Sequence, residues 1–129
     1  MTYVADTHAF VWFLTNDPKL GKEAHSILQK ADEGKETIIV PTIVLAEMLQ
    51  ICENKDVSLK FRDILSKLAS STNYVSYALD VEVLIKAQDL SEIREMHDRI
   101  IVATAIITNC KILTKDSVIK QFNKAETVW

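Results

Sequence analysis

The sequence has very little glycine, with only Gly21 and Gly34 among its 129 residues. Walker-type phosphate loops and dinucleotide-binding fingerprints both need several closely spaced glycines, because only glycine lets the backbone approach a phosphate so closely. Neither loop can be built from this chain. The scarcity of glycine therefore excludes nucleotide-binding folds of these two types.

Cysteines and long apolar stretches are also scarce. Cys52 and Cys110 lack motif spacing and predict buried free thiols of a reducing compartment, not a disulfide framework or a zinc site. The N-terminus lacks a basic region before an apolar run, so no cleaved signal peptide is expected. The longest strongly apolar stretch, residues 100–107, is far shorter than the roughly 20 residues that span a bilayer. We expect a cytoplasmic protein without a membrane partner.

An excess of positive charge is missing as well. The formal net charge of -3 at pH 7 argues against a large basic face that neutralises many phosphates, so any contact with nucleic acid must be local. With 48% hydrophobic and 26% charged residues, the composition is that of an ordinary folded protein. The length predicts one domain over residues 1–129.

Short β-branched runs alternate with helical patterns along the chain. The runs predict strands at residues 3–5, 37–40, 74–77 and 111–114, with a last edge strand at 127–128. The helical patterns cover residues 9–14, 17–34, 42–53, 57–68, 80–85 and 98–109, and a further helix start at 116. Because parallel strands need helical crossovers, this alternation predicts an α/β fold, a three-layer α/β/α arrangement with a central, mainly parallel sheet.

Capping residues predict where three of these helices begin. Asp17 followed by Pro18 is expected to start the second helix, and another helix is expected directly after Asp56. The residue types of segment 98–109 favour a strand, but the segment is longer than a usual strand of about 5 or 6 residues. Its length predicts a helix, with Asp98 placed to cap it.

Three aspartates stand at the junctions of strands and helices. Asp6 and Asp116 each follow a strand, and Asp98 starts a helix. Ligands of open α/β sheets bind outside the carboxyl ends of the strands, so these side chains are expected to meet at one edge. Each aspartate could instead simply cap its helix. Asp80 satisfies the same positional rule without any sign of chemistry, so position alone does not decide.

Glu47 lies inside an apolar helix and shares a face with Ile43, Val44 and Ile51. A buried carboxylate is costly without a cation. The partner could be a metal ion or the side chain of Arg99, and the helix alone leaves both open.

Four segments carry a resemblance to a known family. They are Val4-Ala5-Asp6-Thr7-His8-Ala9, Leu45-Ala46-Glu47, His97-Asp98-Arg99-Ile100-Ile101-Val102-Ala103-Thr104-Ala105 and Leu113-Thr114-Lys115-Asp116. In their order and spacing, over nearly the whole chain, they resemble the PIN-domain ribonucleases, in particular the toxins of VapBC toxin-antitoxin pairs.

The resemblance implies a single PIN-like nuclease domain that is a metal-dependent endoribonuclease. Asp6, Glu47, Asp98 and Asp116 would be its catalytic acids and would hold one or two Mg²⁺ or Mn²⁺ ions, hard cations that prefer carboxylate oxygens. The resemblance further implies an RNA substrate, an antitoxin protein as partner, and a homodimer.

Several other side chains are candidates for supporting roles. Thr7 and Thr114 flank the acids and are expected to hold water or metal, although capping is the ordinary role of Thr7. Arg99 is expected to orient an acid or, with Lys111 and Lys115, to contact RNA phosphates; solvated surface charge is the ordinary role of such residues.

Aromatic residues and histidines complete the candidates. Phe10, Trp12 and Phe13 are expected in the core, and the resemblance adds a groove for an antitoxin helix or a homodimer contact. The three histidines are expected to be non-catalytic, because no serine or cysteine stands in a nucleophile context.

Two other functions remain open. A Mg²⁺-binding receiver domain has a similar length and sheet, but it places paired acids at the end of its first strand, whereas Thr7 and His8 follow Asp6 here. A catalytically silent PIN-like binding scaffold would need none of the four acids, all of which are present.

Overall fold

The computed structural model describes residues 1–55 and 57–129, so Asp56, which is expected to precede a helix, lies outside the described residues. The strands are β1 (Thr2–Ala5), β2 (Thr37–Pro41), β3 (Tyr74–Tyr77), β4 (Lys111–Leu113) and β5 (Thr127–Val128). They form one sheet in the order β3-β2-β1-β4-β5, and every pairing is parallel. All five predicted strands are confirmed, and the sheet is fully parallel among the described residues.

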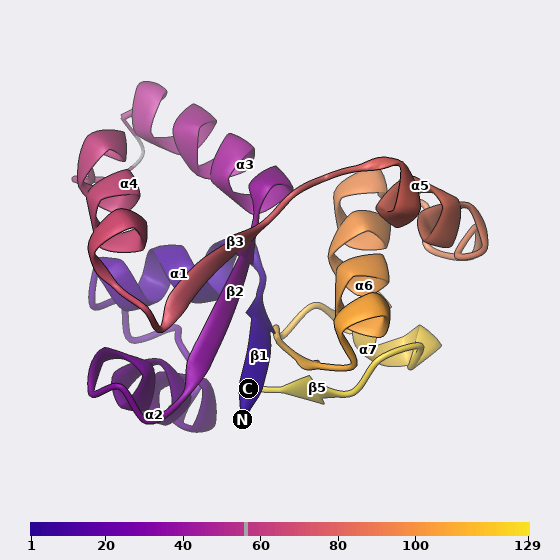
Figure 1. The fold of residues 1–129 in the computed structure, drawn as a ribbon, viewed down its shortest axis with the longest axis horizontal. Coiled ribbons are helices and arrows are strands. Elements are labelled where there is room, and N and C mark those ends of the chain that lie inside the picture. The colour runs from indigo at the N-terminus through magenta and orange to yellow at the C-terminus, as the bar shows by residue number, and fades with distance from the viewer. Residues whose placement is uncertain (56) are drawn as a thin grey trace.

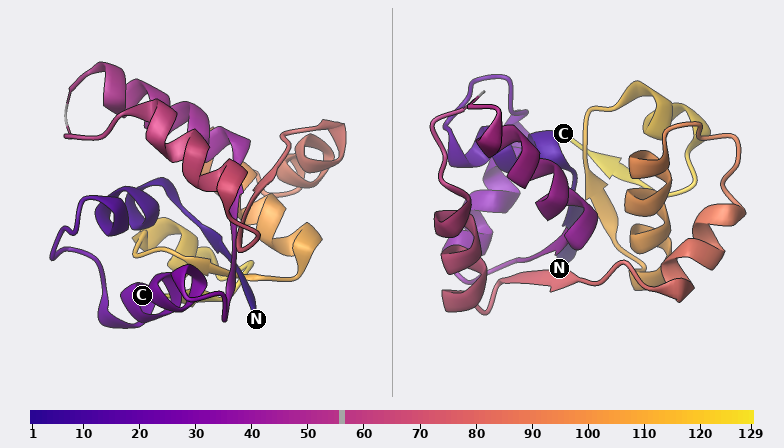
Figure 2. Two further views of the ribbon diagram at one scale, coloured as in Figure 1. Left: turned by 60° about the vertical axis from the view of Figure 1, so that its left-hand side comes forward. Right: turned by 90° about the horizontal axis from the view of Figure 1, so that it is seen from above.

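The helices are α1 (Thr7–Leu14), α2 (Lys22–Asp32), α3 (Thr42–Glu53), α4 (Phe61–Ser70), α5 (Val81–Gln88), α6 (Met96–Thr108) and α7 (Ser117–Phe122). In Figure 1, α1, α2 and α4 lie to the left of the sheet and α5 and α6 to its right. The view from above in Figure 2 keeps the two groups on opposite sides. The predicted three-layer α/β/α architecture is confirmed. None of the helices in the described ranges is long and apolar enough to cross a bilayer.

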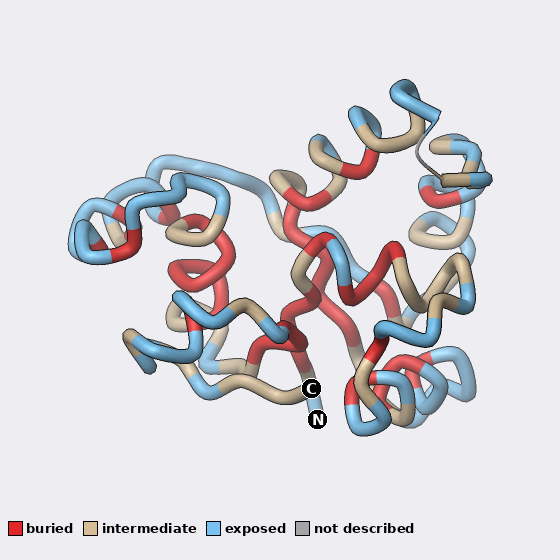
Figure 3. Tube along the Cα trace, turned by 180° about the vertical axis from the view of Figure 1, so that it is seen from behind, coloured by how far each residue is buried: buried red, intermediate tan, exposed pale blue. Residues whose placement is uncertain are grey.

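The central strands are buried on both faces, which explains their continuous apolar runs. Val4, Ile38 and Ile112, on three neighbouring strands, have no exposed surface. In Figure 3 the buried segments run through these strands and the inner sides of the helices, while the outer turns are exposed. The helices thus cover the sheet and leave its carboxyl edge to the loops and helix starts.

Helix α3 connects the two helical layers at that edge. It starts directly after Pro41 at the carboxyl end of β2, and it contacts both α1 and α6. Val44 and Met48 are fully buried, one helical turn apart, and hold it against the core. A side chain on the adjacent face of α3 therefore lies near the starts of α1 and α6.

Two predicted helix starts are wrong. Helix α2 begins at Lys22, because Oδ1 of Asp17 accepts a hydrogen bond from the backbone N–H of Lys19 (2.9 Å) and forms a turn around Pro18 instead of a cap. Helix α4 begins at Phe61, because Val57 and Leu59 pack against the core as part of the preceding connection.

The cap of α6 is also corrected. Its N-cap is Glu95, and Asp98 lies in the first turn. An acidic residue is favourable at both places, because the unpaired N–H groups make a helix N-terminus positive. The predicted helix over residues 98–109 is confirmed, and its start lies two residues earlier than expected.

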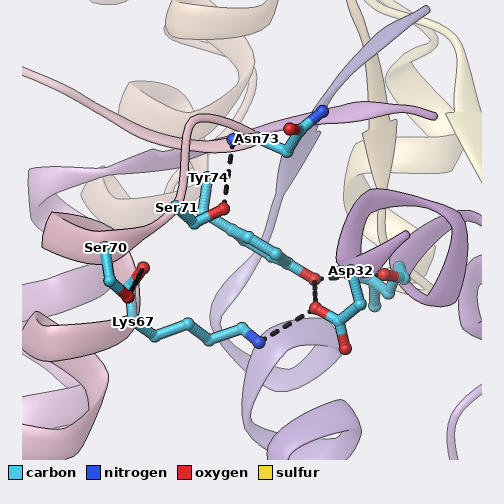
Figure 4. Close-up of polar contacts among 7 residues, drawn as sticks. Asp32, Lys67, Ser70, Ser71, Asn73 and Tyr74 are labelled. Carbon is cyan, nitrogen blue, oxygen red and sulfur yellow. Dashed lines mark hydrogen bonds and ion pairs between the residues drawn. The ribbon is translucent and has the colours of Figure 1, made fainter. Parts of the chain in front are cut away.

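A polar cluster ties α2, α4 and β3 together (Figure 4). The buried Tyr74 hydroxyl donates to Oδ1 of Asp32 (2.8 Å) or to the carbonyl of Leu28 (3.1 Å). Lys67 Nζ lies 2.9 Å from the same Asp32 oxygen and 4.7 Å from the centre of the Tyr74 ring. Burial, followed by the Asp32 hydrogen bond and charge, raises the pKa of Tyr74 well above its usual value, so its hydroxyl stays a donor.

Burial of the cysteines and aromatic residues differs in part from expectation. Cys52 and Cys110 are free thiols, as predicted, but they are half-buried. Phe10 is fully buried, whereas Trp12 and Phe13 are half-buried and only pack against the core. These two rings of α1 therefore keep some surface in contact with solvent.

Candidate metal centre

A cavity of ≈ 170 Å³ opens where the starts of α1, α6 and α7 meet α3. Its walls carry all four acids proposed from the sequence, Asp6, Glu47, Asp98 and Asp116. These side chains come from the end of β1, the middle of α3, the first turn of α6 and the loop after β4. The parallel sheet brings residues from four distant segments to one edge.

Asp6 both caps a helix and lines the cavity. Its Oδ1 accepts a hydrogen bond from the backbone N–H of Ala9 (2.8 Å), which caps α1, and its Oδ2 accepts one from the Thr114 hydroxyl. The pKa of Asp6 is raised, chiefly by burial and also by the charge of Asp116, although the bonds from Thr114 and Ala9 and the charge of His8 oppose the shift. Capping and a place in the cavity are thus compatible for this residue.

Asp116 likewise caps a helix and lines the cavity, at the junction of β4 and α7. Its Oδ1 accepts from the backbone N–H groups of Val118 (2.9 Å) and Ile119 (3.0 Å), which caps α7. The backbone N–H of Asp116 donates to the Thr114 hydroxyl oxygen (3.0 Å), and that hydroxyl donates to Asp6. Thr114, only 3% exposed, therefore holds two of the acids in a fixed relation.

Glu47, expected to be buried within its apolar helix, is half-buried. Its side chain faces the cavity, where Oε1 accepts a hydrogen bond from the Thr7 hydroxyl (2.6 Å). Thr7 is 3% exposed. Its hydroxyl, and not a cationic side chain, is the hydrogen-bond partner of the Glu47 carboxylate.

Arg99 is not the partner of Glu47. Its guanidinium donates to the backbone carbonyls of Ile93 and Ser91, with Nη2 3.3 Å from the Ser91 oxygen. Within residues 1–55 and 57–129, no ion pair joins Arg99 to an acid of the cavity. Arg99 instead fixes the connection between α5 and α6, which leads into the first turn that carries Asp98.

Asp98 reports the electrostatics of the cavity. Burial first, and then the negative charges of the other acids, raises its pKa to about 6; in order of effect these acids are Asp116, Glu95, Asp6 and Glu47. The carboxylates are thus close enough to repel one another. A cluster of this kind is stabilised by protons or by a cation.

The chemistry of these residues fits a divalent cation. Carboxylate oxygens are the ligands that Mg²⁺ and Mn²⁺ prefer, and burial and the neighbouring acids both disfavour the charged form of Asp98, which a cation would stabilise. In the described part of the chain, no three Asp, Glu, His or Cys side chains stand close enough to hold one ion together. The carboxylate oxygens are suitable ligands for the ion, but the acidic side chains must rotate before several of them can bind it together.

Three further titratable side chains line the cavity, and the sequence did not place them there. They are His8, Glu95 and His97. Glu95 lies 3.7 Å from the ring of His97, and both residues are exposed at the start of α6. The sequence could have indicated the two histidines by their position, because His8 follows Asp6-Thr7 and His97 precedes Asp98. His25 instead packs edge-on against Phe13, at 5.7 Å between ring centres.

The two lysines expected near the acids lie at opposite edges of the sheet. Lys115 lines a second cavity beside the first. Lys111 lies at the amino end of β4, pairs with Glu126 at 3.4 Å and lines a separate cavity of ≈ 450 Å³. The expected phosphate contact by Lys111 is therefore not supported. The larger cavity contains none of the four acids.

Comparisons with known proteins agree with this fold. The sequence model of the PIN domain matches residues 3–125. A search of curated proteins found no match. The structure superposes on VapBC2 from Rickettsia felis bound to a promoter DNA fragment with a TM-score of 0.72 at 17% identity, covering 99% of this chain and 98% of that one.

Two further solved structures are similar. A toxin-antitoxin complex from Klebsiella pneumoniae gives a TM-score of 0.68 at 15% identity, covering 98% of this chain and 96% of that one. FitAcB from Neisseria gonorrhoeae gives 0.61 at 15% identity, with the same coverage of 98% and 96%. At these identities the likeness concerns the fold.

Proposed function

The chain belongs to the PIN-domain family, and we propose that it is a Mg²⁺- or Mn²⁺-dependent endoribonuclease, the toxin component of a toxin-antitoxin pair. The observation that carries the proposal is the convergence of Asp6, Glu47, Asp98 and Asp116 on one cavity, where burial and then the neighbouring negative charges raise the pKa of Asp98 to about 6. Paired acids of a receiver domain do not explain four acids from four segments.

The four acids would hold the divalent ion. The ion, when bound, supplies a Lewis acid that activates water and offsets the charge that develops on the phosphodiester. Thr114 positions Asp6 and the loop of Asp116, and Thr7 positions Glu47. Arg99 acts on the site indirectly, by fixing the connection that precedes Asp98. The side chains that meet the ion are thus oriented by neutral donors.

The proposed partners are an antitoxin protein and a second copy of the chain. The half-buried rings of α1 supply apolar surface for an antitoxin helix, and the Klebsiella pneumoniae neighbour is a toxin-antitoxin complex. Helix α5 exposes Val81 (69%), Leu84 (47%) and Ile85 (61%), a surface suited to contact between copies. The cytoplasmic location stays a prediction.

Cleavage of a fluorescent single-stranded RNA tests the proposal. We expect cleavage with Mg²⁺ or Mn²⁺, none with EDTA, and loss of activity in Asp98→Asn. Asp80→Asn is the control, because Asp80 caps α5 as Asp6 and Asp116 cap α1 and α7, but it lies outside the cavity. An Asp98→Asn variant as active as the wild type would contradict the proposed chemistry. Failure of the wild type to cut any RNA would favour the silent scaffold.

A further inference from the structure

A second cavity of ≈ 290 Å³ adjoins the acidic one. It is lined by Asp6, His8, Lys115, Asp116 and Ser117, and three of these residues, Asp6, His8 and Asp116, also line the acidic cavity. The two cavities are therefore adjacent, with the acids between them. Lys115 is the only lysine or arginine among the residues described as lining either of them.

The Lys115 side chain lies over an aromatic ring. Its Nζ is 4.7 Å from the centre of the Trp12 ring, within the range of a cation–π contact. The His8 ring lies 5.3 Å from the same Trp12 ring on the cavity side. Lys115 is exposed, and no ion pair in the described part of the chain includes it.

The Trp12 ring is itself held in place. Trp129 meets it edge-on at 5.8 Å, and Trp129 packs directly on Gly21, where an added Cβ would lie 2.5 Å from the Trp129 backbone carbon. Lys19 Nζ approaches the Trp12 ring at 5.4 Å, but it also lies 3.9 Å from Asp17. Lys115 is thus the ammonium group that a fixed ring holds next to the acids without a carboxylate partner of its own.

Electrostatics make this placement significant. The chain has a net charge of -3, and the acidic cavity repels a phosphodiester backbone. A polyanion held there needs a positive group near the scissile phosphate, and a single local lysine satisfies the requirement that contact be local.

We propose that Lys115, positioned by Trp12, binds an RNA phosphate next to the one that is cleaved. The subsite is the cavity that Lys115 shares with His8 and Ser117. The proposal rests on the proposed function, because it takes RNA as the ligand. Trp12 is a positioning residue, and its ring keeps the Lys115 ammonium at the cavity.

Equilibrium binding tests the subsite without requiring cleavage. A 5′-fluorescein single-stranded RNA of random sequence is titrated with the Asp98→Asn protein, so that the RNA stays intact, over a range of salt concentrations. We expect Lys115→Gln in this background to weaken binding about threefold to tenfold and to lower the salt slope by about 0.7, the value for one lost phosphate contact on a single strand. Lys115→Arg should keep both values.

The matched control is Lys120→Gln, which removes an exposed lysine of α7 outside both cavities and should leave binding within about twofold. Trp12→Leu should weaken binding as Lys115→Gln does, while Trp12→Phe, which keeps a ring, should restore most of it. If Trp12→Leu does not fold, the Lys115 series decides alone.

Unchanged affinity and salt slope in Lys115→Gln would overturn the subsite and leave this surface to an acidic protein segment. In the cleaving protein, we expect Lys115→Gln to raise KM with little change in kcat. Lys115-dependent binding by a wild type that never cuts RNA would overturn the proposed function but support the subsite. RNA cleavage and binding that do not depend on Lys115 would support the proposed function but overturn the subsite.

Discussion

The Thr7 hydroxyl donates a 2.6 Å hydrogen bond to Oε1 of Glu47, joining the first residue of α1 to the middle of α3 across 40 positions of sequence. The bond is short for a hydroxyl and a carboxylate, and such charge-assisted bonds are stronger than neutral ones. It orients Glu47, which lies in the middle of α3 and not at the start of a helix. Thr7 is consequently a second point, besides Thr114, at which a neutral hydroxyl fixes an acid.

Thr7→Val tests this role, because valine keeps the shape of the side chain and removes the donor. We expect metal-dependent RNA cleavage to fall by about tenfold, the usual effect of losing a group that orients a metal ligand. The Mg²⁺ concentration needed for half-maximal activity should rise. Thr15→Val is the control, because the Thr15 hydroxyl donates to the Val11 carbonyl at the other end of α1. Equal activity in the two variants would show that Thr7 does not contribute to the function of the site.

Asp98 makes the stability of the metal-free protein depend on pH. Its pKa is about 6 in the folded protein against 3.8 ordinarily, so between these values the folded state binds more protons than the unfolded state. Stability therefore falls as the pH rises through this window. Asp98→Asn removes the loss, and at pH 7 in EDTA it should be about 1–2 kcal/mol more stable than the wild type, a value reduced for partial exposure.

Urea unfolding between about pH 4 and 8 measures this difference. The gain of Asp98→Asn should disappear toward pH 4, where the wild-type carboxyl is protonated. Asp80→Asn, outside the cavity, should not reproduce it. A gain that is the same at every pH would mean that charge in the cavity is not its cause.

Tyr74→Phe tests the polar cluster of Asp32, Lys67 and Tyr74, which lies outside the acidic cavity. It removes the hydroxyl that bonds to Asp32 or Leu28, and we expect a loss of about 1–2 kcal/mol in the free energy of unfolding with unchanged activity. Tyr77→Phe is the control on the same strand, because no hydrogen bond of the Tyr77 hydroxyl is present in the described residues. Equal stability of the two variants would show that the cluster contributes little.

The strands and the sheet could be predicted because they depend on local pattern. Runs such as 37–40 are apolar on both faces, which only a sheet covered on both sides explains. Helix starts were harder to predict. At Asp17 the sequence offers a cap followed by proline, yet the same pair also forms a turn, and the two differ only in where the Asp17 oxygen finds its donor.

The sequence predicted that the four acids lie together, but it did not predict the contacts that each acid makes. Glu47 was expected to need a cation, and its donor is Thr7, which no pattern within α3 could indicate. Arg99 was a reasonable partner by charge, but its donors are used by two carbonyls. Asp80 satisfies the same rule of position as Asp6 and lies outside the cavity, so sheet order rather than local sequence separates them.

Titration of Mn²⁺ into the RNA-free protein, followed by calorimetry, tests the central claim most directly. The wild type is expected to bind one or two ions, and each of Asp6→Asn, Glu47→Gln, Asp98→Asn and Asp116→Asn to weaken binding at least about tenfold. Asp80→Asn should bind as the wild type does. Wild-type affinity in all four variants, or no binding by the folded wild type, would contradict a metal site built from these acids.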